Sequence, residues 1–398
     1  MSDIGPFGSG GPFEDIMRNL AKLFTSSGPV NWEIARQFAR WAATGGTSEA
    51  NVDPVARVRI EELLRVAELH VAQATGFPAP GGAPLTARAV TPSEWALRTL
   101  EAWRGIFERL AGALAAAAPS GPEQPEEGGD PMAQLFGNLP QMLGPFLFGM
   151  QAGSMVGMLA GRAMGQYDLP MPRPESSELL VLPMTIDRFA DDWSLARDDV
   201  RLWVCLREVT LHTILGRPHV RTRLDALIGD YVGAFHPDPH VIEDRLAGLD
   251  PTDPSSMQAA FSDPTGLLGD LQSDEQRRLQ LPLRALLSVV AGYTDHVMAD
   301  VGQRLLERYG PLTEALHRRR LEDQGEARSL AQLLGVDLDA AGFERGQAFV
   351  QGVVERAGEE ALGRLWTSPG GLPTPAEVDA PGLWLARIEL DLPSGEGG

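Results

Sequence analysis

The stretch Trp203-Val-Cys-Leu-Arg-Glu-Val-Thr-Leu-His212 forms the middle of a predicted long helix. The acidic segment 191–199 precedes it, where negative charge stabilises a helix N-terminus, and Gly216-Arg-Pro218 follows it with residues that end helices. Cys205 is the only cysteine of the chain, so no internal disulfide is possible, and its place in the helix predicts a small buried apolar residue. The part of this helix that suggests a function is the region around Glu208.

Glu208 and its neighbours have the spacing of a metal-binding helix. In the H-E-x-x-H motif of zinc proteases two histidines stand one turn apart on one face, so both imidazoles reach one metal ion, while the Glu polarises the bound water. Here Arg207 and Leu211 stand at the two histidine positions. A guanidinium has no acceptor lone pair and a leucine side chain has no donor atom, so neither residue can bind zinc.

Stretches along nearly the whole chain resemble the zincin-like hydrolases of high-GC bacteria, a family of zinc-dependent metalloproteases. They are Gly28 to Glu33, Gly165 to Pro170, Leu202 to His212, Gly292-Tyr293, Asp295 to Met298, Arg318 to Arg320, Leu372 to Glu377 and Trp384 to Arg387. In that family a Glu-Gly-Tyr segment supplies the third metal ligand, and this chain has Ala291-Gly292-Tyr293. The resemblance implies that Arg207, Leu211 and Ala291 occupy the three ligand positions, so we expect the zinc to be lost and no cofactor to be bound.

Glu208 keeps the position of the general base, and its role stays open. Without a metal its carboxylate has little catalytic work to do, so a structural, salt-bridged glutamate is one interpretation. Another is that the guanidinium of Arg207, or of a neighbouring arginine, takes the place of the metal cation and pairs with the acidic lining. A third is a relocated metal site, because His212 lies one turn after Glu208 and Asp295 could complete the set.

The resemblance implies a mainly α fold with a small β element and a zincin-like architecture, and composition divides the chain into five parts. Residues 1–12 and residues 393–398 are expected to be flexible tails. Residues 13–117 carry apolar residues at helical spacing and form an N-terminal helical region. Residues 118–131 are rich in Pro, Gly and acidic residues and are the predicted linker. Residues 132–392 form the zincin-like region.

Five glycines recur every fourth residue after this linker, a glycine-zipper pattern: Gly149, Gly153, Gly157, Gly161 and Gly165. The segment 131–161 carries no charged side chain. One interpretation is a membrane helix that packs through small residues. Pro140 and Pro145 interrupt the apolar run, and no basic flank accompanies it, so we expect a helix buried in the protein core and no membrane insertion.

Four further patterns predict local structure around the site. Leu179 to Ile186 is the clearest strand candidate, and Pro183 indicates an edge position or a bulge. Thr91-Pro-Ser-Glu94 is a capping box that starts a helix through Leu110. Residues 281–306 read as one long helix that carries Ala291 and Asp295. The basic run 318–320 favours a solvated, ion-paired face over a phosphate site.

Charge and composition limit the class of partner. The chain has 398 residues with 34 basic and 54 acidic side chains, a net charge of −20 that repels nucleic acid and anionic lipid. The N-terminus has no basic and apolar segments of the kind found in signal peptides, so we expect a cytoplasmic protein.

Two functions from different classes follow from these patterns, with a membrane-associated protein as a third. The first is a catalytically degenerate zincin-like protein, a pseudo-metalloprotease that binds an unknown protein or peptide in the old cleft. The second is an active zinc-dependent metallohydrolase with displaced metal ligands. The sequence alone leaves open whether the protein is an enzyme.

Overall fold

The computed structural model describes residues 28–117, 131–235, 272–322 and 326–390. The predicted tails, the linker through residue 130 and residues 13–27 of the predicted N-terminal helical region lie outside the described residues. The chain is mostly helical with a single two-stranded sheet in its described part, which confirms the expected mainly α fold with a small β element.

The elements follow one another with mostly short connections. The helices are α2 (Trp32–Thr44), α3 (Pro54–Thr75), α4 (Pro92–Ala102), α5 (Arg104–Ala117), α6 (Pro131–Ala160), α7 (Pro183–Asp192), α8 (Arg197–Leu215), α9 (Pro218–Gly233), α13 (Asp274–Leu305), α14 (Tyr309–Glu322), α15 (Glu326–Leu333), α16 (Ala340–Ala357), α17 (Pro375–Asp379) and α18 (Pro381–Leu390), with 3₁₀ segments η2 (Glu359–Trp366) and η3 (Pro369–Gly371). The strands β1 (Thr86–Ala89) and β2 (Glu178–Val181) pair in parallel, with Thr86 opposite Glu178.

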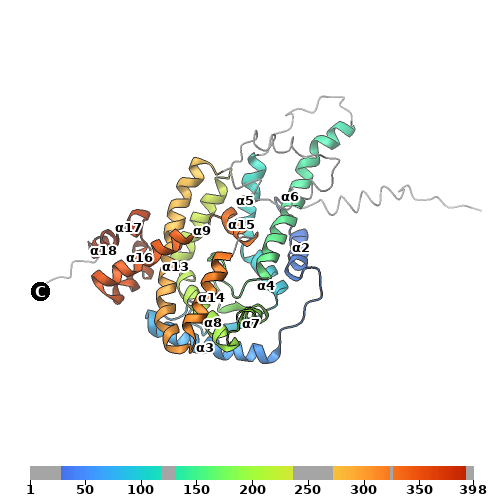
Figure 1. The fold of residues 1–398 in the computed structure, drawn as a ribbon. Helices are drawn as coiled ribbons and strands as arrows, with labels where there is room; N and C mark the ends of the chain where they lie inside the picture. The colour runs from blue at the N-terminus through green and yellow to red at the C-terminus, as the bar shows by residue number, and fades with distance from the viewer. Residues whose placement is uncertain (1–27, 118–130, 236–271, 323–325, 391–398) are drawn as a thin grey trace, which may run out of the picture.

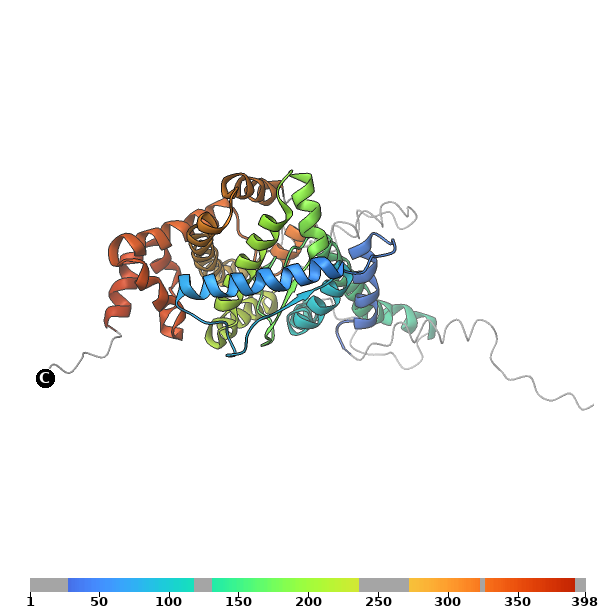
Figure 2. The ribbon, with the colours of Figure 1, turned by 90° about the horizontal axis from the view of Figure 1, so that it is seen from below.

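The long helix α13 runs through the middle of the molecule and packs against α8, α9 and α16 (Figure 1). The C-terminal helices α16 to α18 form one end, and the pair α2 and α6 lies toward the other. Seen from below, α3 lies lengthwise across the underside (Figure 2). One hydrophobic core extends from Ala35 to Ile388, so elements on both sides of the predicted linker share it.

The structure corrects three local predictions. The strand predicted at 179–186 ends at Val181, and Pro183 begins α7 because its fixed φ suits the first turn of a helix. The helix predicted from Thr91 through Leu110 is interrupted at Trp103, which separates α4 from α5. The acidic segment 191–199 is divided between the end of α7 and the first turn of α8. Strand β1 was not predicted, because four residues of ordinary composition carry little signal.

Three of the five periodic glycines allow α6 to lie directly on α2. A Cβ atom at Gly149, Gly153 or Gly157 would lie 2.4, 2.2 or 2.4 Å from a backbone carbonyl oxygen of α2 or its N-cap, those of Asn31, Ala35 and Ala39. Only glycine permits so close an approach of two backbones. Among the described residues, no helix has the length and apolar character needed to cross a membrane.

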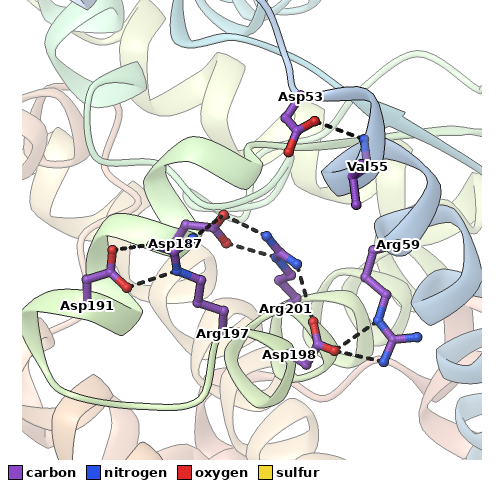
Figure 3. A network of polar contacts seen from close by, with 8 residues as sticks. All are labelled: Asp53, Val55, Arg59, Asp187, Asp191, Arg197, Asp198 and Arg201. Atoms are coloured by element: carbon purple, nitrogen blue, oxygen red, sulfur yellow. Dashed lines mark hydrogen bonds and ion pairs between the residues drawn. The ribbon is translucent and has the colours of Figure 1, made fainter.

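Ion pairs connect α8 to α7 and α3 at the N-terminal end of α8 (Figure 3). The guanidinium of Arg201 forms two hydrogen bonds with Asp187, at 2.8 and 2.6 Å, and also contacts Asp198. Asp198 in turn pairs with Arg59 of α3 at 2.8 Å. Because the Arg201–Asp187 pair is largely buried and bidentate, it fixes the direction in which α8 enters the core.

Candidate functional site

Helix α8 places Glu208 in the protein interior, where its side chain is 1% exposed. The segment after α6 crosses directly over it, and a Cβ atom at Gly165 would lie 2.3 Å from the Glu208 carboxyl carbon. The Gly165 carbonyl accepts a hydrogen bond from the Trp95 indole at 2.9 Å, and Gly165 also bridges Val181 at the end of β2. Gly165, the last glycine of the periodic series, therefore leaves the space that the Glu208 carboxyl group occupies.

Both carboxylate oxygens of Glu208 are hydrogen-bonded. Oε2 accepts from the Tyr167 backbone N–H at 2.7 Å, and Oε1 accepts from Arg207 Nη1 at 2.9 Å. The same nitrogen of Arg207 also donates to the Tyr167 carbonyl at 3.2 Å. Burial raises the pKa of Glu208 to about 7, against the opposing effects of Arg207 and of the Tyr167 N–H. The buried carboxyl group of Glu208 is thus held by a cradle formed by the Tyr167 backbone and the Arg207 guanidinium.

His212 lies next to this cradle and is also buried. Its Nδ1 forms a 3.0 Å hydrogen bond with the hydroxyl of Tyr167, while its Nε2 is enclosed without a hydrogen bond of standard geometry to a described residue. Burial lowers the pKa of His212 to about 4, with a backbone group of Ser176 opposing the shift. Burial also raises the pKa of Tyr167 to about 12. At neutral pH both side chains are therefore uncharged.

A cleft of about 500 Å³ lies beside the site, between α8, α13, α14 and α16. Leu211 of α8 and Ala291 of α13 both line it, so two of the three predicted ligand positions face the same space. Arg207 stands one turn before Leu211 on α8. The remaining apolar residues of this lining include Leu159, Leu287, Val290 and Phe343.

Asp295 lies in this cleft rather than beside His212. Its Oδ2 accepts a hydrogen bond from Gln347 at 3.3 Å and is 3.9 Å from Nη1 of Arg320. The guanidinium of Arg320 stacks over the ring of Phe343 at 4.2 Å. Burial lowers the pKa of Arg320, and the positive charge of Arg207 lowers it further.

The three positions predicted to correspond to metal ligands carry side chains that do not fit a zinc ion. Arg207 presents a cation that is bonded to Glu208 and to a carbonyl, and Leu211 and Ala291 present only carbon atoms to the cleft. Within residues 28–117, 131–235, 272–322 and 326–390, no group of three or more His, Cys, Asp or Glu side chains is arranged to hold a metal ion. No step that requires zinc is therefore derived for these residues.

Two residues of the site had no assigned role in the sequence. Tyr167 lies within a stretch that carried only the resemblance, yet its backbone and hydroxyl contact Glu208 and His212. Arg320 belongs to the basic run 318–320, whose members separate in the structure: Arg318 pairs with Glu314 on the surface, whereas Arg320 faces the cleft. The i, i+4 spacing of Glu314 and Arg318 was the one signal that could have divided the run.

The chain matches a protein-family model and is similar to a solved structure. Residues 30–385 match the family model described as zincin-like metallopeptidase. A protein from Chloroflexus aurantiacus, described as a "putative hydrolase with a novel fold", is similar in structure with a TM-score of 0.61 and 24% sequence identity. The match covers 92% of this chain and 100% of that chain, and at this identity it shows the fold alone. No curated protein matches the chain.

Proposed function

The chain belongs to the zincin-like metallopeptidase family, and from this premise we propose that it is a catalytically degenerate member that binds a protein or peptide. In this proposal the cleft of the family fold remains, while the chemistry that a metal would supply is gone. Glu208 then stabilises the fold as a paired buried acid and has no reacting group to serve.

One observation carries the proposal: the guanidinium of Arg207 is hydrogen-bonded to Glu208 at 2.9 Å. The general base of the family faces a cation that belongs to the protein itself. A permanently charged guanidinium neutralises the buried carboxylate without needing a metal, and it cannot be displaced as an ion can. Replacement of the other two ligand positions by Leu211 and Ala291 turns that side of the cleft into an apolar surface suited to contact with a ligand side chain.

The alternative is an active zinc-dependent hydrolase with displaced ligands, and the enclosed Nε2 of His212 is the observation that favours it. A buried imidazole can serve as a metal ligand, although a backbone group of Ser176 lies close enough to this ring to act on its pKa. However, Asp295 lies in the cleft, where it accepts a hydrogen bond from Gln347, and it would have to move to meet His212. The degenerate reading needs no such rearrangement.

Restoring the family ligands tests the proposal directly. A triple variant with Arg207→His, Leu211→His and Ala291→Glu supplies the three donor side chains on the helices that already meet, α8 and α13. In zinc titration calorimetry we expect a new one-to-one site in this variant and no comparable site in the unchanged protein. Equal zinc affinity of the two proteins would show that the native residues already hold the metal and would reject the proposal.

A further inference from the structure

Arg320 lines the cleft with a side chain that is 39% exposed, so solvent and a ligand can reach its guanidinium. No described residue accepts a hydrogen bond from it, and its ion pair with Asp295 spans 3.9 Å, beyond hydrogen-bond distance. Its Cζ atom lies over the Phe343 ring, 4.2 Å from the ring centroid. A stacked guanidinium loses little freedom when it binds a carboxylate with two parallel hydrogen bonds, so this residue is preorganised to receive one.

An apolar surface lies in the same cleft. Leu211 and Ala291, the two ligand positions without donor atoms, line it together with Leu287 and Val290. A cleft of about 500 Å³ is within the range that encloses a small ligand or a few residues of a peptide. A ligand whose carboxylate binds Arg320 would therefore have the side chain beside that carboxylate in contact with the apolar surface.

We propose that the cleft binds the C-terminal end of a peptide, with the terminal carboxylate on Arg320 and the last side chain, an apolar one, against Leu211 and Ala291. The inference rests on the proposed binding function and names its ligand class. A peptide terminus matches the arrangement because it carries a carboxylate and an adjacent side chain on the same carbon. The contact requires no metal and no bond cleavage.

The cleft lining also includes five acidic residues, Asp168, Asp295, Asp337, Asp339 and Glu344, and all but Glu344 have a partner other than Arg320 among the described residues. Asp337 and Asp339 share one ion-pair partner, Arg284, which offsets one of their two negative charges. Asp295 receives a hydrogen bond from Gln347, so it keeps a partner when Arg320 turns to a ligand. Arg328 of α15, an exposed basic residue of the lining, adds a second positive charge and acts on Asp337, whose pKa it lowers against the effect of burial.

Fluorescence polarisation with matched peptides tests the inference. The probes are fluorescein-labelled hexapeptides with five varied positions and a terminal leucine, each made as a free acid and as an amide. For the sequences that bind, we expect the acid to bind about tenfold or more tightly than the amide, because a bidentate charge-assisted pair is lost in the amide. Amidated peptides with glutamate in place of the terminal leucine carry a side-chain carboxylate but no terminal one, so they test whether the terminal carboxylate itself is required.

Two variants assign the effect to its residues. Arg320→Gln should reduce the ratio of acid to amide affinity to near one, whereas Arg318→Gln, on the same helix but paired with Glu314 on the surface, should leave the ratio unchanged. Ala291→Leu should weaken the acid and the amide alike by filling the apolar surface. Circular dichroism melting controls for folding of each variant.

The outcomes separate this inference from the proposed function. Equal binding of acid and amide, an unchanged ratio in Arg320→Gln, or equal binding of amidated glutamate peptides would overturn the terminal-carboxylate site and leave peptide binding in place. Failure of every probe to bind in either form would overturn the site and remove the support for peptide binding as well.

Discussion

Replacement of Arg207 by alanine should destabilise the protein by an amount that depends strongly on pH. The pair it breaks consists of a Glu208 carboxylate that is 1% exposed and a guanidinium side chain that is 24% exposed, joined at 2.9 Å. Removing one partner of a fully buried pair costs about 3–5 kcal/mol. Because Arg207 is partly exposed, we expect about 2–3 kcal/mol at pH 9, where Glu208 is ionised.

The cost should be much smaller at pH 5, for a reason that follows from the pKa of Glu208. Its value is raised from 4.5 to about 7 in the folded protein. The folded state therefore binds more protons than the unfolded state between these values, so the contribution of Glu208 to the free energy of unfolding falls as pH rises through this window. At pH 5 the folded protein holds Glu208 protonated, and loss of Arg207 removes a hydrogen bond worth about 1 kcal/mol.

Urea unfolding at pH 5 and pH 9 measures both values, and the difference between variant and wild type cancels groups that titrate alike in the two proteins. The Glu208→Gln background is the control: there the cost of Arg207→Ala should be small and equal at the two pH values, since no charge is left to pair. An equal cost at both pH values in the native background would refute the account of Arg207 as the counter-charge of Glu208.

Further predictions concern packing and reactivity. Gly153→Ala should lower the free energy of unfolding by about 2 kcal/mol or more, because the new methyl group would meet a carbonyl of α2 at 2.2 Å. The control is Gly112→Ala, an exposed helix position with open space, which should be neutral or stabilising by about 0.5 kcal/mol. Equal melting temperatures of the two variants would contradict this prediction. Gly165→Ala should lower the free energy of unfolding, because the new methyl group would collide with the Glu208 carboxyl group. Most of that loss should disappear in the Glu208→Ala background, and additive effects of the two substitutions in a double-mutant cycle would contradict this explanation. Cys205, buried and with a pKa raised to about 12, should react with a thiol reagent only after unfolding, and rapid labelling of the native protein would contradict the burial.

Much of the helical framework could be predicted from the sequence, because caps and periodic apolar residues act locally. Thr91 caps α4 by accepting from Glu94 N–H, and Gly216 ends α8, as the residue types indicate. The zincin-like family and the mainly α fold also followed from the sequence. The strand predicted at 179–186 was too long, because an apolar run is compatible both with a strand and with the start of a buried helix. Only the packing of the folded chain decides between them.

The site was only partly predictable. The spacing of Arg207, Glu208 and Leu211 on one helix is a local property, and the sequence shows directly that Arg207 and Leu211 carry no metal-ligand atom. The contacts of Glu208 with Tyr167 and the stacking of Arg320 on Phe343 join residues far apart in the chain, and nothing in their local sequence specifies such partners. Glycine periodicity suggested close packing, yet it could not say that α2 would be the neighbour.

The zinc content of the purified protein tests the central claim most directly. The tag-free protein, purified with zinc present and then passed through a desalting column, is measured by elemental mass spectrometry beside a Glu208→Ala variant assayed for peptide hydrolysis. The account predicts far less than one zinc per chain and no hydrolysis that depends on Glu208. Near-stoichiometric zinc, with hydrolysis lost in the variant, would contradict it and direct the search for ligands to His212 and Asp295.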